Sequence, residues 1–296
     1  MFMELKISNL SKTYPNGVKA LDQINLTIGP GMFGLLGPNG AGKSSLMRTI
    51  ATLQSPDIGE LTFGDINVLQ DKNQLRKVLG YLPQEFGVYP NMSAEDLLNY
   101  FADLKGISNR QERRTIVDKV LEITNLSSFR RNSVSGYSGG MKQRFGIAQM
   151  LLNNPKLIIV DEPTAGLDPA ERHRFLNVLR EIGAEHTVIF STHIVDDVRD
   201  LCHELAIMNA GKVLFRGTTQ EGTAKLLGKI WTKRIDRAGF EQENAMHNII
   251  SSNYNPDNSL NIRVWNDTQP NDTFSEAKPI LEDVYFVALK AEKIHV

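Results

Sequence analysis

Cysteine and long apolar runs are both scarce in this sequence. The only cysteine is Cys202, which excludes an intramolecular disulfide and suits a reducing compartment. Apolar runs such as "LIIV" at 157–160 are short, whereas crossing a bilayer takes about 20 apolar residues. The N-terminal stretch "MFMELKISNL" lacks the hydrophobic segment of a signal peptide. We therefore expect a cytoplasmic protein, unless another component carries it to a membrane.

An excess of charge of either sign is also missing. The 33 basic and 34 acidic side chains nearly cancel, to a formal net charge of −1, and no long run of one sign occurs. Composition thus gives no electrostatic reason to expect nucleic acid as a partner, and we expect none. At 296 residues the chain is long enough for one full-sized core and a smaller additional domain.

The N-terminal part reads as strands followed by a glycine-rich loop. Between residues 3 and 28 apolar and polar side chains alternate between turns, which is typical of antiparallel strands. The short apolar run "MFGLLG" at 32–37 predicts a buried strand. Leu46, Ile50 and Leu53 then show helical spacing, so the loop should lie between a strand and a helix.

The middle of the chain is predicted to be helical, and the part that follows is predicted to alternate between strands and helices. Apolar residues three and four apart recur from Ser93 to about residue 132, and Ser93 followed by Asp96 is a plausible capped start. We interpret residues of about 85–150 as an inserted helical subdomain. Beyond it "KLIIVDEP", "PAERHRFLNVLREIGA" and "HTVIFST" alternate as strand, helix and strand, which predicts a mostly parallel sheet.

The alternation stops after a hairpin near residue 218. We predict one α/β domain over 1–221 and a small accessory α+β domain over 222–296. The latter has a strand-like "KIWTKRID", a polar Asn-rich middle and a helical "AKPILEDVYFVALKAEK".

"GPNGAGKS", residues 37–44, fits the phosphate loop GxxxxGK[ST]. Its glycines allow successive backbone N–H groups to point into one concavity, where they and the following helix N-terminus bind phosphate oxygens. Lys43 is expected to reach the β and γ phosphates and the Ser44 hydroxyl to ligate Mg²⁺. The predicted nucleotide contacts here are Gly37, Pro38, Asn39, Gly40, Ala41, Gly42, Lys43, Ser44 and Ser45.

A pair of acids follows the buried strand "LIIV". Asp161 at the strand end is expected to lie beside the phosphate loop and hold Mg²⁺ through water. Glu162 could orient or deprotonate the attacking water. Two acids after a strand are more often a cap or a solvated turn, but with a phosphate loop in the same chain the metal and water roles are favoured.

"YSGGMKQR", residues 137–144, is similar to the signature sequence of the ABC ATPase family. With the phosphate loop and the two acids in the family's order, residues 4 to about 220 resemble the nucleotide-binding subunit of an ABC transporter, with its P-loop NTPase core. Two signature positions depart from the family: Tyr137 stands where leucine is usual, and Met141 where glutamine is usual. The phosphate-contacting Ser138, Gly139 and Gly140 are intact.

The resemblance implies roles for four further residues. Tyr14 corresponds to the aromatic residue that stacks on adenine, the alternative being a strand tyrosine that covers the core. Gln84 corresponds to the glutamine that senses metal and water. Asp168 corresponds to the acid that couples two sites across a dimer, and His193 to the switch histidine that contacts the γ phosphate. The expected catalytic set is then Lys43, Gln84, Glu162 and His193, and the expected metal set Ser44, Gln84 and Asp161.

The family also implies partners. The signature residues would close over ATP bound to a second ATPase subunit, in a dimer that holds two nucleotides and Mg²⁺. An integral membrane permease subunit would keep the pair on the inner face of the cell membrane. The segment after Gln84 and the late "LEDVYFVAL", residues 281–289, resemble the branch that exports drugs, polysaccharides and lipids. For the late segment a plain amphipathic docking helix is an equal alternative.

Three other functions are weighed against export. Import is the alternative within transport. A soluble ABC ATPase acting on DNA or ribosomes would need a long coiled coil or a second nucleotide domain, and the chain has no sustained heptads and one phosphate loop. A small-molecule kinase would have no use for "YSGGM". We therefore expect an ATPase that powers export through a separate membrane subunit.

Overall fold

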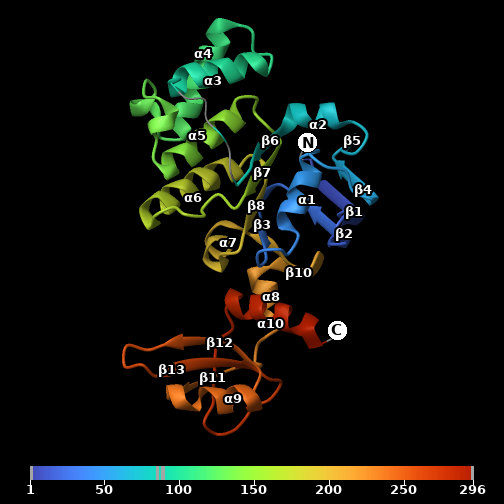
Figure 1. The fold of residues 1–296 in the computed structure, drawn as a ribbon, viewed down its shortest axis with the longest axis vertical. Coiled ribbons are helices and arrows are strands. Elements are labelled where there is room, and N and C mark those ends of the chain that lie inside the picture. The colour runs from blue at the N-terminus through green and yellow to red at the C-terminus, as the bar shows by residue number, and fades with distance from the viewer. Residues whose placement is uncertain (1–2, 85–86, 88–90, 295–296) are drawn as a thin grey trace.

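The computed structural model describes residues 3–84, 87 and 91–294, which form three sheets and the helices around them (Figure 1). The first sheet is antiparallel, with strand order β2-β1-β4-β5. Its strands are β1 (Leu5–Thr13), β2 (Lys19–Ile28), β4 (Ile58–Phe63) and β5 (Ile66–Asn67). This sheet is the predicted N-terminal antiparallel subdomain.

The central sheet has strand order β10-β9-β3-β8-β7-β6 and confirms the predicted mostly parallel core. Only the β9–β10 hairpin at its edge pairs antiparallel among these strands. The strands are β3 (Gly31–Leu36), β6 (Leu79–Leu82), β7 (Leu157–Asp161), β8 (Thr187–Thr192), β9 (Glu204–Asn209) and β10 (Lys212–Thr218). The chain leaves β3, β7 and β8 at the same edge, where the site described below is built.

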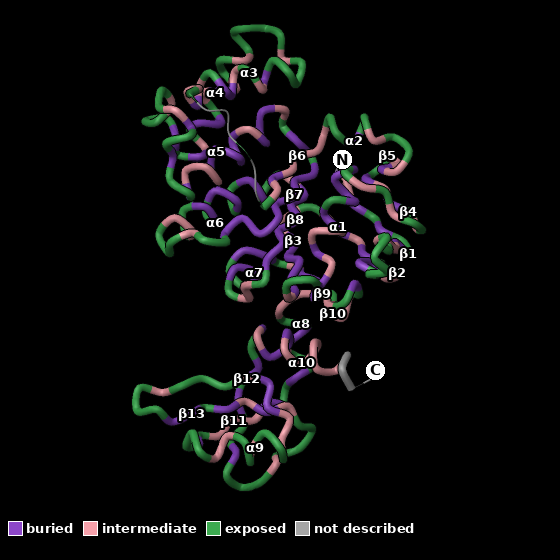
Figure 2. The backbone as a smooth tube through the Cα atoms, viewed as in Figure 1, coloured by how far each residue is buried: buried purple, intermediate pink, exposed green. Residues whose placement is uncertain are grey.

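Both faces of this sheet are covered, which explains why β7 is an uninterrupted apolar run. Leu157 and Ile159 belong to one core cluster, with α1 (Lys43–Ile50) and the antiparallel sheet. Ile158 and Val160 belong to the other, with the helices on the opposite face. Those helices are α5 (Gly139–Leu151), α6 (Pro169–Gly183) and α7 (Val195–Leu201). Figure 2 shows the buried strands between the two layers.

Helix α1 is shorter than the sequence predicts, because the helical spacing of apolar residues extends to Leu53. Leu46 and Ile50 are buried as expected, but the helix ends at Ile50 and Leu53 is 61% exposed. The inclusion of Leu53 was therefore wrong, because the chain turns at Thr52, whose φ of 62° lies in the left-handed region. The next elements, α2 (Lys72–Val78) and β6, return the chain to the central sheet.

The helical subdomain consists of α3 (Ala94–Leu104), α4 (Arg110–Ile123) and the first part of α5. Ser93 caps α3 as predicted: its Oγ accepts a hydrogen bond from the Asp96 N–H at 3.1 Å. Tyr137 is buried, meets the Phe145 ring edge-on at 6.4 Å and donates its hydroxyl to the Phe129 carbonyl at 2.8 Å. The departure from leucine in the signature is thus accommodated, since the one polar atom is satisfied.

The C-terminal extension is a third sheet, with order β12-β13-β11-β14, and helices on either side. Its elements are α8 (Thr219–Ala224), β11 (Ile230–Ile235), α9 (Phe240–Met246), β12 (Ile249–Tyr254), β13 (Leu260–Trp265), β14 (Ser275–Glu276) and α10 (Leu281–Ile294). The Asn-rich middle thus forms the β12–β13 hairpin, which sequence reasoning missed. The buried alternation of Leu260, Ile262 and Val264 was the available signal.

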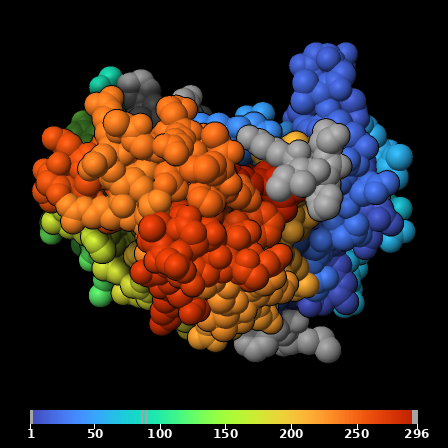
Figure 3. All heavy atoms as spheres, turned by 90° about the horizontal axis from the view of Figure 1, so that it is seen from below, coloured from blue at the N-terminus to red at the C-terminus, as the bar shows by residue number. Residues whose placement is uncertain are grey.

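The extension lies at the end of the molecule opposite α3 and α4, and Figure 3 shows its atoms covering most of that end. Helix α10 contacts α7, β9 and β10 of the first domain as well as α8 and β12. An ion pair between Arg263 of β13 and the buried Asp283 of α10, at 2.7 Å, fixes the sheet to this helix. The boundary between 221 and 222 falls within α8 and stays a prediction. No helix among the described residues is both long and apolar enough to span a membrane.

Candidate nucleotide site

The loop of residues 37–44 connects β3 to α1, as the motif requires. Gly40 and Gly42 have φ of 83° and 101°, in the left-handed region that glycine adopts without penalty. A Cβ at Gly42 would lie 2.3 Å from the Ala20 carbonyl oxygen, and one at Gly37 would lie 2.4 Å from that of Met208. The surrounding backbone therefore admits only glycine at these two positions, and the loop keeps the shape of an anion cradle.

Lys43 begins α1 and is 4% exposed. Its ammonium donates to the carbonyl oxygens of Gly37 at 2.8 Å and Pro38 at 3.2 Å, both in the same loop. The third partner is Glu162, whose Oε1 lies 3.0 Å away. A buried ammonium needs such partners, because an unpaired charge in this environment is costly. The lysine is thus held inside the cradle by the cradle itself.

The two acids at the end of β7, Asp161 and Glu162, point to different partners. Asp161 is 3% exposed and accepts a 2.6 Å hydrogen bond from the Ser191 hydroxyl of the neighbouring strand β8. Burial raises the pKa of Tyr81 on β6, and the nearby Asp161 carboxylate raises it further. Glu162 leaves the strand with a φ of 48°, which directs its carboxylate to Lys43. Because Asp161 and Glu162 are consecutive residues, it is the backbone turn at Glu162 that directs the two carboxylates to different partners.

His193 follows β8, and its Nδ1 lies 2.7 Å from Oε2 of Glu162. An ionised carboxylate can only accept, so Nδ1 carries the proton of this bond and Nε2 is left for another partner. Lys43, Glu162 and His193 therefore form one continuous chain of polar contacts at the ends of β3, β7 and β8. The sequence predicted these three residues for one site, and the structure brings them together.

Tyr14 is half-buried beside the start of α1. Its hydroxyl donates to Oε1 of Gln54 at 3.0 Å and lies 3.1 Å from Oγ of Ser45, which must donate because a phenol has one proton. The Gln54 amide in turn donates to the Ser45 carbonyl at 2.8 Å. Gln54 was missed from sequence, since it lies beyond every motif and meets Tyr14 only through the fold.

The signature residues stand apart from these contacts. Ser138 caps α5 by accepting from the Met141 N–H at 3.2 Å, and Ser138 and Gly139 are exposed. Gly140 is buried against α6, where a Cβ would lie 2.2 Å from Oε2 of Glu171. Helices α1 and α5 pack on opposite faces of the central sheet, as Figure 1 shows. The signature therefore presents an exposed helix start away from its own phosphate loop.

Two further predicted residues have other surroundings. Asp168 caps α6, because its Oδ1 accepts a hydrogen bond from the Glu171 N–H at 2.9 Å. One carboxylate oxygen of Asp168 therefore serves its own helix. Gln84 is exposed just after β6. The segment after Gln84 that was compared with exporters includes residues 85–86 and 88–90, which lie outside the described residues.

The side chains at this edge of the sheet fit a site for ATP and Mg²⁺. Ser44, Gln84 and Asp161 offer oxygen atoms, the ligands that Mg²⁺ prefers. No group of three or more His, Cys, Asp or Glu side chains that could cage a metal occurs among the described residues. A Mg²⁺ ion would accordingly use the Asp161 carboxylate, the Ser44 hydroxyl and the Gln84 amide oxygen, and would complete its shell with phosphate oxygens and water, which is its usual mode at nucleotide sites.

A phosphate loop between β3 and α1, with buried acids at the end of β7 on the same edge of the sheet, defines a nucleotide-binding ATPase. The family model described as ABC transporter matches residues 21–165. The chain is 38% identical to the uncharacterized ABC transporter ATP-binding protein YxlF of Bacillus subtilis, over 73% of this chain and 72% of that one. It belongs to the ABC transporter family and is an ATP-hydrolysing subunit of an ABC transporter.

Two other relatives differ in how far they match. The probable multidrug ABC transporter ATP-binding protein YbhF of Escherichia coli is 31% identical over 95% of this chain, which spans about half (51%) of that protein. The methionine import ATP-binding protein MetN of Corynebacterium diphtheriae is 35% identical over 73% of this chain and 66% of its own length. The relatives thus include both a multidrug and an import protein.

Solved structures agree with the fold. The chain matches CbiO1 of Clostridium perfringens, described as part of the ABC transporter complex CbiONQ, with a TM-score of 0.69, 29% identity, and coverage of 75% of this chain and 90% of that one. It also matches the ATP-binding cassette MJ0796, solved as a dimer bound to ADP and phosphate, with a TM-score of 0.65, 28% identity, and coverage of 72% and 98%. The P-loop NTPase core predicted from sequence is confirmed.

Proposed function

We propose that two copies of this chain close around two ATP molecules, and that the cycle of closure and hydrolysis drives export through a separate membrane subunit. The observation that carries the proposal is the contact of the buried Glu162 carboxylate with both Lys43 and His193. The Glu162 carboxylate thus contacts both Lys43, which is expected to bind the γ phosphate, and His193, which is expected to respond to that phosphate.

The roles follow from the contacts. Lys43, anchored on two loop carbonyls, directs its charge at the β and γ phosphates, where it offsets the charge that develops on the transferred group. Glu162, freed from Lys43 when phosphate oxygens take its place, orients the attacking water and accepts its proton. Mg²⁺, when bound by Ser44, Gln84 and Asp161, supplies further neutralisation of the phosphates. His193 holds Glu162 on one side and offers Nε2 to the γ phosphate.

The shared site rests on where the signature lies. Ser138 and Gly139 are exposed at the start of α5, on the face of the sheet opposite α1. A helix start carries unpaired N–H groups that suit a phosphate, and a second subunit can present its nucleotide to them. Hydrolysis removes the bridging phosphate and lets the halves separate. The structure of the cassette MJ0796, which has the same fold, is itself a dimer bound to ADP and phosphate, and this supports pairing.

Export is supported by the match to a multidrug protein over nearly the whole chain. The alignment with YbhF takes in 95% of the chain and so includes most of the C-terminal extension. The extension ends in α10, which contains the segment that resembles the exporter branch. Import remains the alternative for a subunit with this core.

The experiment is to tag the Glu162→Gln variant, solubilise membranes in mild detergent with ATP and identify what copurifies. A polytopic membrane protein in stoichiometric amount is the expected result, and its reconstitution with this chain gives the direction of transport. Ribosomes or DNA-bound proteins, with the chain absent from membranes, would overturn the transport proposal. The matched control is Lys43→Ala, which should not form the ATP-bound pair.

Replacing the ring of Tyr14 should weaken nucleotide binding and leave turnover at saturation nearly unchanged. Stacking on a base contributes about 1–3 kcal/mol, so Tyr14→Ala should raise the dissociation constant for ATP by roughly 5-fold to 150-fold. Tyr14→Phe keeps the ring and loses only the bonds to Ser45 and Gln54, so it should bind closer to wild type. Titration with a fluorescent ATP analogue measures both, and an unchanged affinity in Tyr14→Ala would refute the stacking role.

A further inference from the structure

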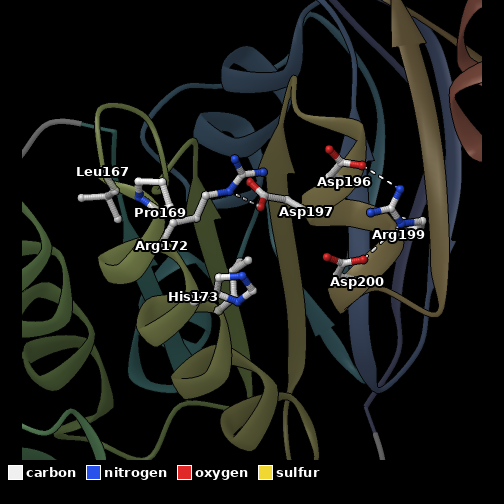
Figure 4. Close-up of a pocket in the computed structure, with 9 residues that line it drawn as sticks. Leu167, Pro169, Arg172, His173, Asp196, Asp197, Arg199 and Asp200 are labelled. Atoms are coloured by element: carbon white, nitrogen blue, oxygen red, sulfur yellow. Dashed lines mark hydrogen bonds and ion pairs between the residues drawn. The ribbon is translucent and has the colours of Figure 1, made fainter.

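A pocket of about 270 Å³, lined by several charged side chains, lies between α6 and α7. Figure 4 shows Arg172 reaching from α6 to Asp197 of α7, while Arg199 turns to Asp196 and Asp200 on its own helix. The three acids of α7 therefore differ in environment. Asp196 and Asp200 are about half exposed, at 54% and 47%, whereas the Asp197 side chain is 1% exposed.

Asp197 uses its two oxygens for two separate segments. Oδ1 accepts from the Arg172 Nε at 2.7 Å, and Oδ2 accepts from the Thr164 hydroxyl at 2.8 Å. Thr164 is itself buried. A buried carboxylate is tolerated because it is both paired with a cation and hydrogen-bonded. With one oxygen committed to each partner, a shift of α7 would break one of the two bonds.

The three partners follow the proposed site residues closely along the chain. Thr164 comes two residues after Glu162, Arg172 four after Asp168, and Asp197 four after His193. On the basis of the proposed function, we infer that Asp197 is a positioning residue. It holds Glu162, His193 and the turn at Asp168 in the positions that hydrolysis requires. It touches neither the phosphate loop nor Lys43 in the contacts that the described residues make.

The consequence is a separation of binding from chemistry. The nucleotide cradle connects β3 to α1, and α1 packs on the face of the sheet opposite α6 and α7. Loss of Asp197 should leave the cradle intact and displace the pair Glu162–His193. Displacements of about 1 Å near reacting groups lower rates by roughly a hundredfold, so a marked fall in kcat is expected without a matching change in KM.

The test compares Asp197→Ala with Asp196→Ala in the full chain. Arg172 is 30% exposed and can turn to solvent when Asp197 is removed, so the variant is expected to fold. Asp197→Ala should lower kcat for ATP hydrolysis by about tenfold to a hundredfold, with KM within about threefold of wild type. Asp196→Ala removes the same charge at the neighbouring position, where the carboxylate belongs to an exposed ion pair with Arg199. This variant should hydrolyse ATP at the wild-type rate.

Asp197→Asn provides the rescue, because its amide oxygen can accept from Arg172 and its NH₂ can donate to Thr164. Recovery of most of the lost kcat is expected, whereas a fold defect would show as a lowered melting temperature and a parallel loss of ATP binding. Unchanged kcat in Asp197→Ala, or kcat and binding lost together, would overturn the inference.

Glu162→Gln is assayed alongside. If that variant is inactive and Asp197→Ala is normal, only this inference fails. If Glu162→Gln stays active, the base role that the proposed function gives to Glu162 fails as well.

Discussion

Lys43→Ala should lower ATP hydrolysis by about two to three orders of magnitude, the usual cost of removing one preorganised charge from a reacting group. The ammonium is 4% exposed and already directed by two carbonyls, so water that replaces it cannot reproduce its position. The change also leaves the Glu162 carboxylate, 8% exposed, without its cationic partner. Steady-state phosphate release measures the effect.

The control for Lys43→Ala is Lys6→Ala. Lys6 is 61% exposed and pairs with Glu4 on the surface of β1, so its removal should leave turnover unchanged. Lys43→Met separates charge from volume, because it keeps the length of the side chain inside the cradle. Hydrolysis by Lys43→Ala at the wild-type rate would remove the phosphate loop from the account.

Glu162→Gln should abolish steady hydrolysis while ATP binding persists. A positioned general base contributes about 10²- to 10⁴-fold, and an amide cannot accept the proton of the attacking water. The substitution preserves the size of the side chain, and its oxygen can still accept from Lys43 or His193, so the local fold is expected to remain. Single-turnover hydrolysis and equilibrium binding of labelled ATP separate the two effects.

The matched control is Glu185→Gln, which makes the same chemical change at an exposed position next to β8. It should hydrolyse ATP normally. A Glu162→Gln variant with wild-type turnover would assign the base to another residue. A variant that neither binds nor hydrolyses ATP would indicate that the Glu162 contacts hold the cradle together and that its role is structural.

The nucleotide site was largely predictable because its parts are local in sequence. The loop at 37–44 carries its own glycines, and its strand and helix follow from the flanking periodicity. The parallel order of β3, β8 and β7 then places Glu162 and His193 at one edge, since strands that run the same way end together. The cap made by Asp168 could also have been found, because Asp followed by Pro is a common helix start.

The parts that could not be predicted depend on contacts between distant residues. Gln54 reaches Tyr14 across 40 positions, and Asp197 meets Thr164 across 33. Nothing in the local pattern of "VDDVRDL" separates the buried Asp197 from the exposed Asp196. Which acid of a helix is buried is decided by what packs beside it, and here that is α6.

The most direct test of the shared-site account is the mass of the Glu162→Gln variant in solution, measured by light scattering with saturating ATP and with ADP. The account predicts twice the 33.1 kDa of one chain in ATP, with one ATP bound per chain, and a single chain in ADP. Adding Ser138→Arg to the same variant should prevent pairing, because the signature would no longer accept the partner's nucleotide. A single chain in saturating ATP would contradict the account.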